Sequence, residues 1–211
     1  MKLKEEQLGD VFQCFIHRLS DQKENIYNRG KYAELLGKLS MKWNEKQLHD
    51  AFNSLKDMLN KDNHWEYREA LETITVKLSR KQFDNAFNYF ISENGYRYSD
   101  LLERIAQGLD EKQMNIALNY CMDKLNDKYE HRNIRIKCIQ LLEMISNKCN
   151  EQQLNEAFNS SMDIFNDKNN DEDVRGGCAE LFGTIAVNLN EKHFDDAFKC
   201  LTNGLKDSHW I

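Results

Sequence analysis

The chain has 211 residues, 40% of them hydrophobic, and a net charge of −6, so it is long enough to bury a core. It has no proline and only nine glycines, a composition that favours α-helix because few residues interrupt it. No run approaches the ~18 apolar residues of a membrane span. The charged N-terminus MKLKEEQLGDVF lacks the pattern of a secretory signal peptide. The acidic balance argues against a general nucleic-acid binder, which presents a basic face to phosphate.

One nine-residue pattern occurs six times along the chain and predicts the first helix of a repeat. Apolar residues recur at i, i+3, i+4 and i+7, as in Leu48, Ala51, Phe52 and Leu55, which places them on one helical face. In all but the first copy, the opening Asn, Ser or Asp can cap a helix N-terminus. The copies are KEEQLGDVF from Lys4, NEKQLHDAF from Asn44, SRKQFDNAF from Ser79, DEKQMNIAL from Asp110, NEQQLNEAF from Asn150 and NEKHFDDAF from Asn190.

A second pattern follows each first helix after a turn rich in Asn and Asp. It reads NRGKYAELLGKLSMKW from Asn28 and VRGGCAELFGTIAVNL from Val174, with shorter matches at 70–78, 101–109 and 141–149. The repeating unit is therefore predicted to be a helical hairpin. A single hairpin cannot cover its own apolar face, so we expect neighbouring hairpins to stack.

The repeats predict an all-α protein with about eleven helices, in five hairpins plus a terminal helix. We expect one repeat domain over residues 1–211, with Trp210 covering its last layer. The predicted repeats are residues 4–43, 44–78, 79–109, 110–149 and 150–189, followed by the terminal helix at 190–211.

The stretch DEDVRGGCAELFGTIA from Asp171 resembles a HEAT or HEAT-like repeat, whose second helix opens with Asp-x-x-Val-Arg. The resemblance implies a right-handed α-α superhelix, with the first helices on the convex side and the second helices on the concave side. It also implies that Arg29, Arg135 and Arg175 bond acids in the turns, with Asp171 or Asp173 as the partner of Arg175. The chain departs from the family in two respects. It lacks the proline of the first helix, and its second and third repeats have Asn63-His64 and Asn94-Gly95 in place of Val-Arg.

No catalytic motif or metal-ligand spacing is visible, so we expect no catalytic residues, no metal and no cofactor. No pair of the six cysteines has CxxC spacing, and we interpret them as reduced, mostly buried thiols of a cytosolic protein. Two enzyme classes remain as alternatives, a thiol enzyme and a HEAT-like enzyme acting on nucleic acid. The cysteines are Cys14, Cys121, Cys138, Cys149, Cys178 and Cys200.

An aromatic and arginine cluster lies where the repeat pattern is least regular, and such departures often mark function. Tyr, Trp and Arg dominate binding hot spots, so this cluster is a candidate partner surface. The alternative is packing between repeats, since Tyr32 occupies the repeat position of Tyr67. The candidate residues are Trp65, Tyr67, Arg68, Tyr96, Arg97 and Tyr98, with Arg104 and Arg135 adding charge.

These observations predict a non-catalytic protein-protein interaction module that presents a concave helical surface. The expected partner is another protein, without nucleic acid or membrane insertion, and the chain is expected to be monomeric and cytoplasmic. Its Asn- and Lys-rich, proline-free composition also resembles that of repeat-containing effectors of intracellular bacterial pathogens. For a translocated effector, or a regulator of one, the compartment would be the host cytosol.

Overall fold

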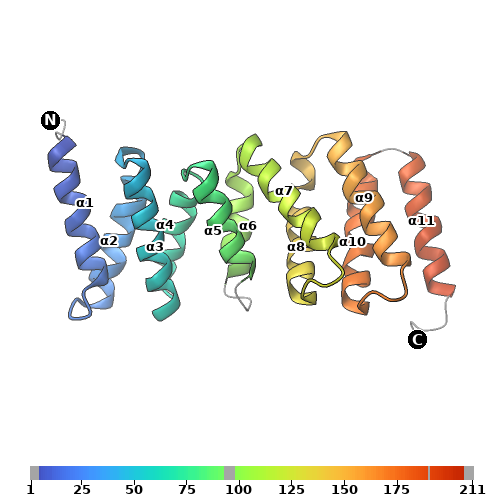
Figure 1. Ribbon diagram of the computed structural model, residues 1–211, viewed down its shortest axis with the longest axis horizontal. Coiled ribbons are helices and arrows are strands. Elements are labelled where there is room, and N and C mark those ends of the chain that lie inside the picture. Colours follow the sequence, from blue (N-terminus) through green and yellow to red (C-terminus); the bar gives the residue numbers. More distant parts are fainter. Residues whose placement is uncertain (1–4, 93–97, 190, 207–211) are drawn as a thin grey trace. The chain divides into compact units, whose positions relative to one another are not determined.

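The computed structural model describes residues 5–92, 98–189 and 191–206, and in these ranges it contains eleven α-helices and no strand (Figure 1). This confirms the predicted all-α class and the predicted number of helices. The chain divides into two compact units, Met1–Tyr89 and Phe90–Ile211. The single repeat domain stays a prediction. None of the described helices is long and apolar enough to cross a membrane.

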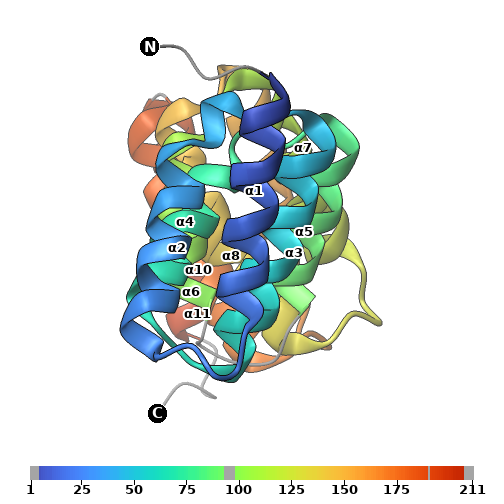
Figure 2. The ribbon, with the colours of Figure 1, turned by 90° about the vertical axis from the view of Figure 1, so that its left-hand side faces the viewer.

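The first unit is built from two helical hairpins and the start of a third. Helix α1 (Glu5–Ser20) pairs with α2 (Ile26–Lys38), and α3 (Glu45–Lys61) pairs with α4 (Trp65–Thr75). Helix α1 also packs on α3, and α2 on α4, so the hairpins stack in two layers (Figure 2). A short 3-10 turn, η1 (Ser40–Lys42), follows α2, and α5 (Arg80–Ser92) begins in this unit.

The second unit repeats the same two-layer packing. Helix α7 pairs with α8 and α9 with α10, while α8 packs on α10, α7 on α9, and α11 on both α9 and α10. Helix α6 packs on α8. The element bounds are α6 (Ser99–Gly108), α7 (Glu111–Asn126), α8 (Arg132–Ile145), η3 (Ser146–Lys148), α9 (Glu151–Asn166), α10 (Glu172–Asn188) and α11 (Glu191–Lys206).

The predicted caps start the first helices where the sequence pattern placed them. Asn44, Asp110 and Asn150 are the N-cap residues of α3, α7 and α9. Each side chain accepts a hydrogen bond from the backbone N–H three residues later. The glutamine at that position accepts one in return from the N-cap backbone N–H, which closes a capping box. The predicted caps are confirmed for these three helices. Asn190 and Trp210, the residue expected to cover the last layer, lie outside the described residues.

The predicted apolar faces form the core between the two layers. On α3, Leu48, Phe52 and Leu55 are at most 8% exposed, and Phe158 on α9 is 2% exposed. Full burial of one such side chain contributes roughly 1.5–3 kcal/mol. The same apolar positions of the repeat are therefore buried on α3 and on α9, which explains why the same pattern recurs along the sequence.

Helices α2 and α4 approach each other closely because two glycines of α2 face α4. A Cβ atom at Gly30 would lie 3.0 Å from Cδ of Glu66, and one at Gly37 would lie 3.2 Å from Cα of Ala70. Glycine leaves room for the neighbouring helix at both points. Because the two helices lie so close, the solvent-facing side of α2 adjoins that of α4. The candidate site lies on these two sides.

Candidate binding surface

Two tyrosines of the predicted aromatic cluster are buried within their own units. Tyr67 on α4 is 0% exposed, and its ring lies 5.8 Å from that of His64. Tyr98, just before α6, is 1% exposed, and its ring lies 5.4 Å from that of Phe90. In this structure both side chains pack in the interior, so a partner surface cannot include them.

The remaining aromatic and arginine residues of the cluster have different environments. Trp65, the first residue of α4, is 64% exposed. Arg68 is engaged locally, because its Nε and Nη2 atoms donate to Oδ1 of Asn63 at 3.2 and 2.7 Å. Tyr96 and Arg97 lie outside the described residues. Among the four described residues of this cluster, Trp65 is the one classed as exposed.

The two additional arginines belong to the second unit and differ from each other. Arg104 on α6 is exposed. Arg135 on α8 is 4% exposed, and it donates through Nε to the carbonyl of Leu125 at 3.0 Å and through Nη2 to Oδ1 of Asn170 at 3.1 Å. Arg135 therefore joins the end of α7 to the turn before α10 and is not available to a partner.

The other repeat arginines make comparable contacts. Nη2 of Arg29 lies 3.1 Å from Oδ2 of Asp62, in the turn before α4. Arg175 donates through Nε to the carbonyl of Phe165 at 2.8 Å, ten residues earlier, as Arg135 does with Leu125. Arg29 thus contacts a turn acid, as the resemblance implies, whereas Arg175 donates to a backbone carbonyl and Arg135 to a backbone carbonyl and the amide oxygen of Asn170.

The acids expected to bond Arg175 contact a different arginine. Oδ2 of Asp171 and Oδ2 of Asp173 lie 3.6 and 3.0 Å from Nη1 of Arg132 on α8. The side chain of Asp171 also accepts hydrogen bonds from backbone N–H groups of the first turn of α10. Both acids thus link α10 to the neighbouring second helix, whereas Arg175 reaches back to its own first helix.

Most of the cysteines are embedded in the helical core. Cys121, Cys138, Cys178 and Cys200 are buried, and Cys14 is exposed. Burial raises the pKa of Cys121, Cys149 and Cys200, and raises the pKa of Cys178 to about 12. A nucleophilic cysteine needs a lowered pKa, so these four lack the environment of a catalytic thiol. In the described part of the chain, no three His, Cys, Asp or Glu side chains gather as metal ligands would.

The outer sides of α2 and α4 form a candidate surface. Tyr27 is 65% exposed and Met41, after the end of α2, is 76% exposed, although both are large hydrophobic residues. On α4, Glu69 follows the exposed Trp65 by four residues and therefore lies on the same helical side. We call this region the α2–α4 surface; it consists of Tyr27, Lys31, Glu34, Lys38 and Met41 with Trp65, Glu69, Thr73 and Lys77.

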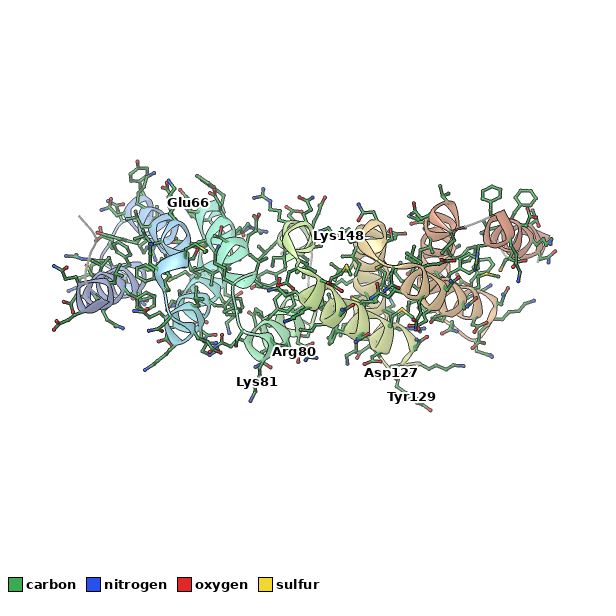
Figure 3. The ribbon with its side chains drawn as sticks, turned by 90° about the horizontal axis from the view of Figure 1, so that it is seen from above. Glu66, Arg80, Lys81, Asp127, Tyr129 and Lys148 are labelled. Atoms are coloured by element: carbon green, nitrogen blue, oxygen red, sulfur yellow. The ribbon has the colours of Figure 1, made fainter. Side chains whose placement is uncertain are left out.

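A shallow groove of about 190 Å³ runs between the two helices, and residues of the α2–α4 surface line it. Its lining includes Gly37 and Ala70, where the helices approach closely, and charged residues of both signs at Lys38, Glu69 and Lys77. Figure 3 shows Glu66 on this side of the first unit and Arg80 and Lys81 on the other. The groove is too small for a drug-sized ligand but could accept one or two side chains of a partner.

The charges on α2 are organised into a small network. Nζ of Lys31 lies 2.8 Å from Oε2 of Glu34, and Lys38 bonds the other oxygen of the same carboxylate. These two hydrogen bonds lower the pKa of Glu34 to about 2, so the carboxylate is ionised at neutral pH. Lys31 also lies over the ring of Tyr27, 5.7 Å from its centre. The network therefore places both signs of charge beside an aromatic ring on the exposed side of α2.

Sequence reasoning missed Tyr27 and Met41, although a signal was present. Both lie outside the apolar positions that the repeat pattern buries, and an apolar residue at a polar position of an amphipathic helix is a candidate contact residue. The recurring glutamine of the capping boxes was also visible in NEKQ, DEKQ and NEQQ.

Compared with known proteins, the chain matches no protein-family model, and no curated protein is significantly similar to it.

Proposed function

We propose that this protein is a non-catalytic protein-binding module that presents the α2–α4 surface to a protein partner. The observation that carries the proposal is the exposure of Trp65, Tyr27 and Met41 on one side of a tightly packed helix pair. Aromatic residues bury much area with few rotatable bonds, so they dominate hot spots when they are exposed. The mixed charges around them suit a protein partner, which offers both signs, better than a nucleic acid.

The proposed architecture behind this surface is a HEAT-like, right-handed α-α superhelix. In that arrangement the first helices of the hairpins form the convex side, and the second helices, including α2 and α4, form the concave side. The two-layer packing within each unit and the recurring arginine contacts support this arrangement. A rigid array would then hold the surface ready for binding, in the cytoplasm or, for a bacterial effector, in the host cytosol.

Affinity capture with a matched control tests the proposal. The baits are the wild-type chain, Tyr27→Ala/Trp65→Ala, and Tyr129→Ala as the control. Tyr129 is 99% exposed in the turn between α7 and α8 of the second unit (Figure 3). We expect a protein that wild type and Tyr129→Ala retain and the double variant loses, while circular dichroism shows equal helix content. A partner that all three baits retain would remove the α2–α4 surface from the proposal.

A further inference from the structure

The pair α10–α11 is a copy of the pair α2–α3. Fourteen of the residues from Arg29 to Leu59 are identical to the residue 146 positions later in the chain. In the first unit, the helix that follows this pair is α4, which packs on both α2 and α3. The corresponding surface of α10 and α11 is therefore built from the counterparts of the residues on which α4 packs in the first unit.

The surroundings of two α10 glycines show that no described helix occupies the position that corresponds to α4. Gly30 and Gly37 of α2 would each place a Cβ atom within 3.2 Å of α4. Their counterparts Gly176 and Gly183 have no heavy atom within 4 Å of that position among the described residues. Glycine in a helix interior lowers stability relative to alanine, so two glycines without a close neighbour are unfavourable unless a helix packs there.

The apolar face of α11 gives a second, independent observation. Phe194 and Phe198 are 55% and 61% exposed, whereas their counterparts Leu48 and Phe52 on α3 are 8% and 4% exposed. On α10, Val187 is 75% exposed. Large apolar side chains exposed on neighbouring helices mark an interaction site.

We propose that α10 and α11 form a docking site for an amphipathic α-helix of a partner protein. The residues that define this α10–α11 site are Gly176, Gly183, Val187, Phe194 and Phe198. The incoming helix lies on the pair as α4 lies on α2 and α3. It carries a small residue against Gly183, as Ala70 lies against Gly37, and apolar residues where α4 has Tyr67, Leu71 and Ile74.

The occupant is a helix from another protein rather than the α4 of a second copy. In the first unit, Tyr67, Leu71 and Ile74 of α4 are each 0% exposed, so a second copy cannot offer them without opening its own core. The α10–α11 site also shares no residue with the α2–α4 surface. The inference therefore goes beyond the proposed function, and either proposal can fail without the other.

The test joins a copy of α4 to the chain. A flexible Gly-Ser linker of about 15 residues after Ile211 carries a copy of residues 62–78, the α4 segment, which raises its local concentration to about the millimolar range. Hydrogen exchange followed by mass spectrometry reports on the backbone amides of α11. The matched variant is Gly183→Leu in the extended chain, because its side chain fills the place of the incoming helix, and circular dichroism checks that it remains helical.

We expect the extension to slow exchange in α11 at least tenfold, and Gly183→Leu to abolish that slowing. Equal exchange with and without the extension would overturn the proposal, because the site then does not accept a helix of this chemistry. Sedimentation of the unextended chain tests whether the occupant is a second copy of this chain. A dimer that Gly183→Leu dissociates would assign the site to a second copy and overturn the partner-helix proposal, whereas a monomer supports it.

Discussion

Trp65 and Tyr67 show how little residue type alone says about exposure. The two aromatic residues are two positions apart on α4, and a helix turns by about 100° per residue, so they point to opposite sides. Tyr67 is fully buried, and Trp65 is 64% exposed. The sequence identified both as candidate contact residues because both are aromatic; the packing of α4 separates them into a core residue and a surface residue.

Replacement of Tyr67 by phenylalanine should stabilise the protein. The Oη atom of Tyr67 is buried and has no hydrogen-bond partner in the described part of the chain, and burial raises its pKa. Burying an unsatisfied hydroxyl costs about 1–3 kcal/mol. We expect Tyr67→Phe to raise the free energy of unfolding by about 1 kcal/mol in urea denaturation followed by circular dichroism. The control Tyr27→Phe, at an exposed position, should change nothing, and a loss of stability in Tyr67→Phe would show that the hydroxyl is bonded.

Removal of the charge on Glu143 should stabilise the protein in a pH-dependent way. Burial, and then the nearby Glu180, raise the pKa of the Glu143 carboxyl. A raised pKa in the folded state favours folding below the unfolded pKa of about 4.3, and this contribution is lost as the pH rises through the folded value. We expect Glu143→Gln to stabilise the chain at pH 7 by less than about 1 kcal/mol, because the group is partly screened by solvent.

Urea denaturation at pH 7 and at pH 4 measures this difference. At pH 4 the carboxyl is largely protonated in both states, so the effect of Glu143→Gln should nearly vanish. Glu180→Gln, which removes the neighbouring charge, should change stability at pH 7 in the same direction. An equal effect of Glu143→Gln at both pH values would contradict the electrostatic explanation.

At the scale of helices, the sequence predicted structure well because local chemistry decides it. Asn44, Asp110 and Asn150 cap helices at the predicted positions, and the apolar spacing that begins at Leu48 forms a buried face. These features depend on residues within one or two turns of each other. What a helix packs against depends on distant parts of the chain, so the different neighbours of Gly37 and Gly183 could not be read from their similar local motifs, AELLG and AELFG.

These two glycines should respond in opposite directions to alanine. Gly183→Ala should stabilise α10 by up to about 1 kcal/mol, because alanine favours helix and its Cβ atom meets nothing within 4 Å. Gly37→Ala should destabilise α2 by about 1 kcal/mol, because its Cβ atom would lie 3.2 Å from the backbone of α4. Native-state hydrogen exchange measures the opening free energy of each helix separately. Equal shifts at both positions would contradict the difference in packing.

At the scale of the whole molecule, the repeats determine the architecture more strongly than the function. A repeated hairpin predicts which faces are buried, because every unit must cover the same apolar surface. A binding surface has no such periodic requirement, so it must be found from exposure. Exposure leaves Trp65 as a contact residue and removes the buried Tyr67, Tyr98 and Arg135 from the predicted cluster. Exposure also adds Tyr27 and Met41, whose sequence signal is only that they are apolar residues outside the buried repeat positions.

The affinity of the captured partner for the purified chain tests the central claim most directly. Isothermal titration calorimetry would compare wild type, Trp65→Ala and the control Tyr129→Ala. If Trp65 anchors the partner, its loss should weaken binding by at least tenfold, and typically by ~30-fold for a hot-spot residue, whereas Tyr129→Ala should bind like wild type. Equal dissociation constants for wild type and a folded Trp65→Ala variant would contradict the α2–α4 surface as the binding site.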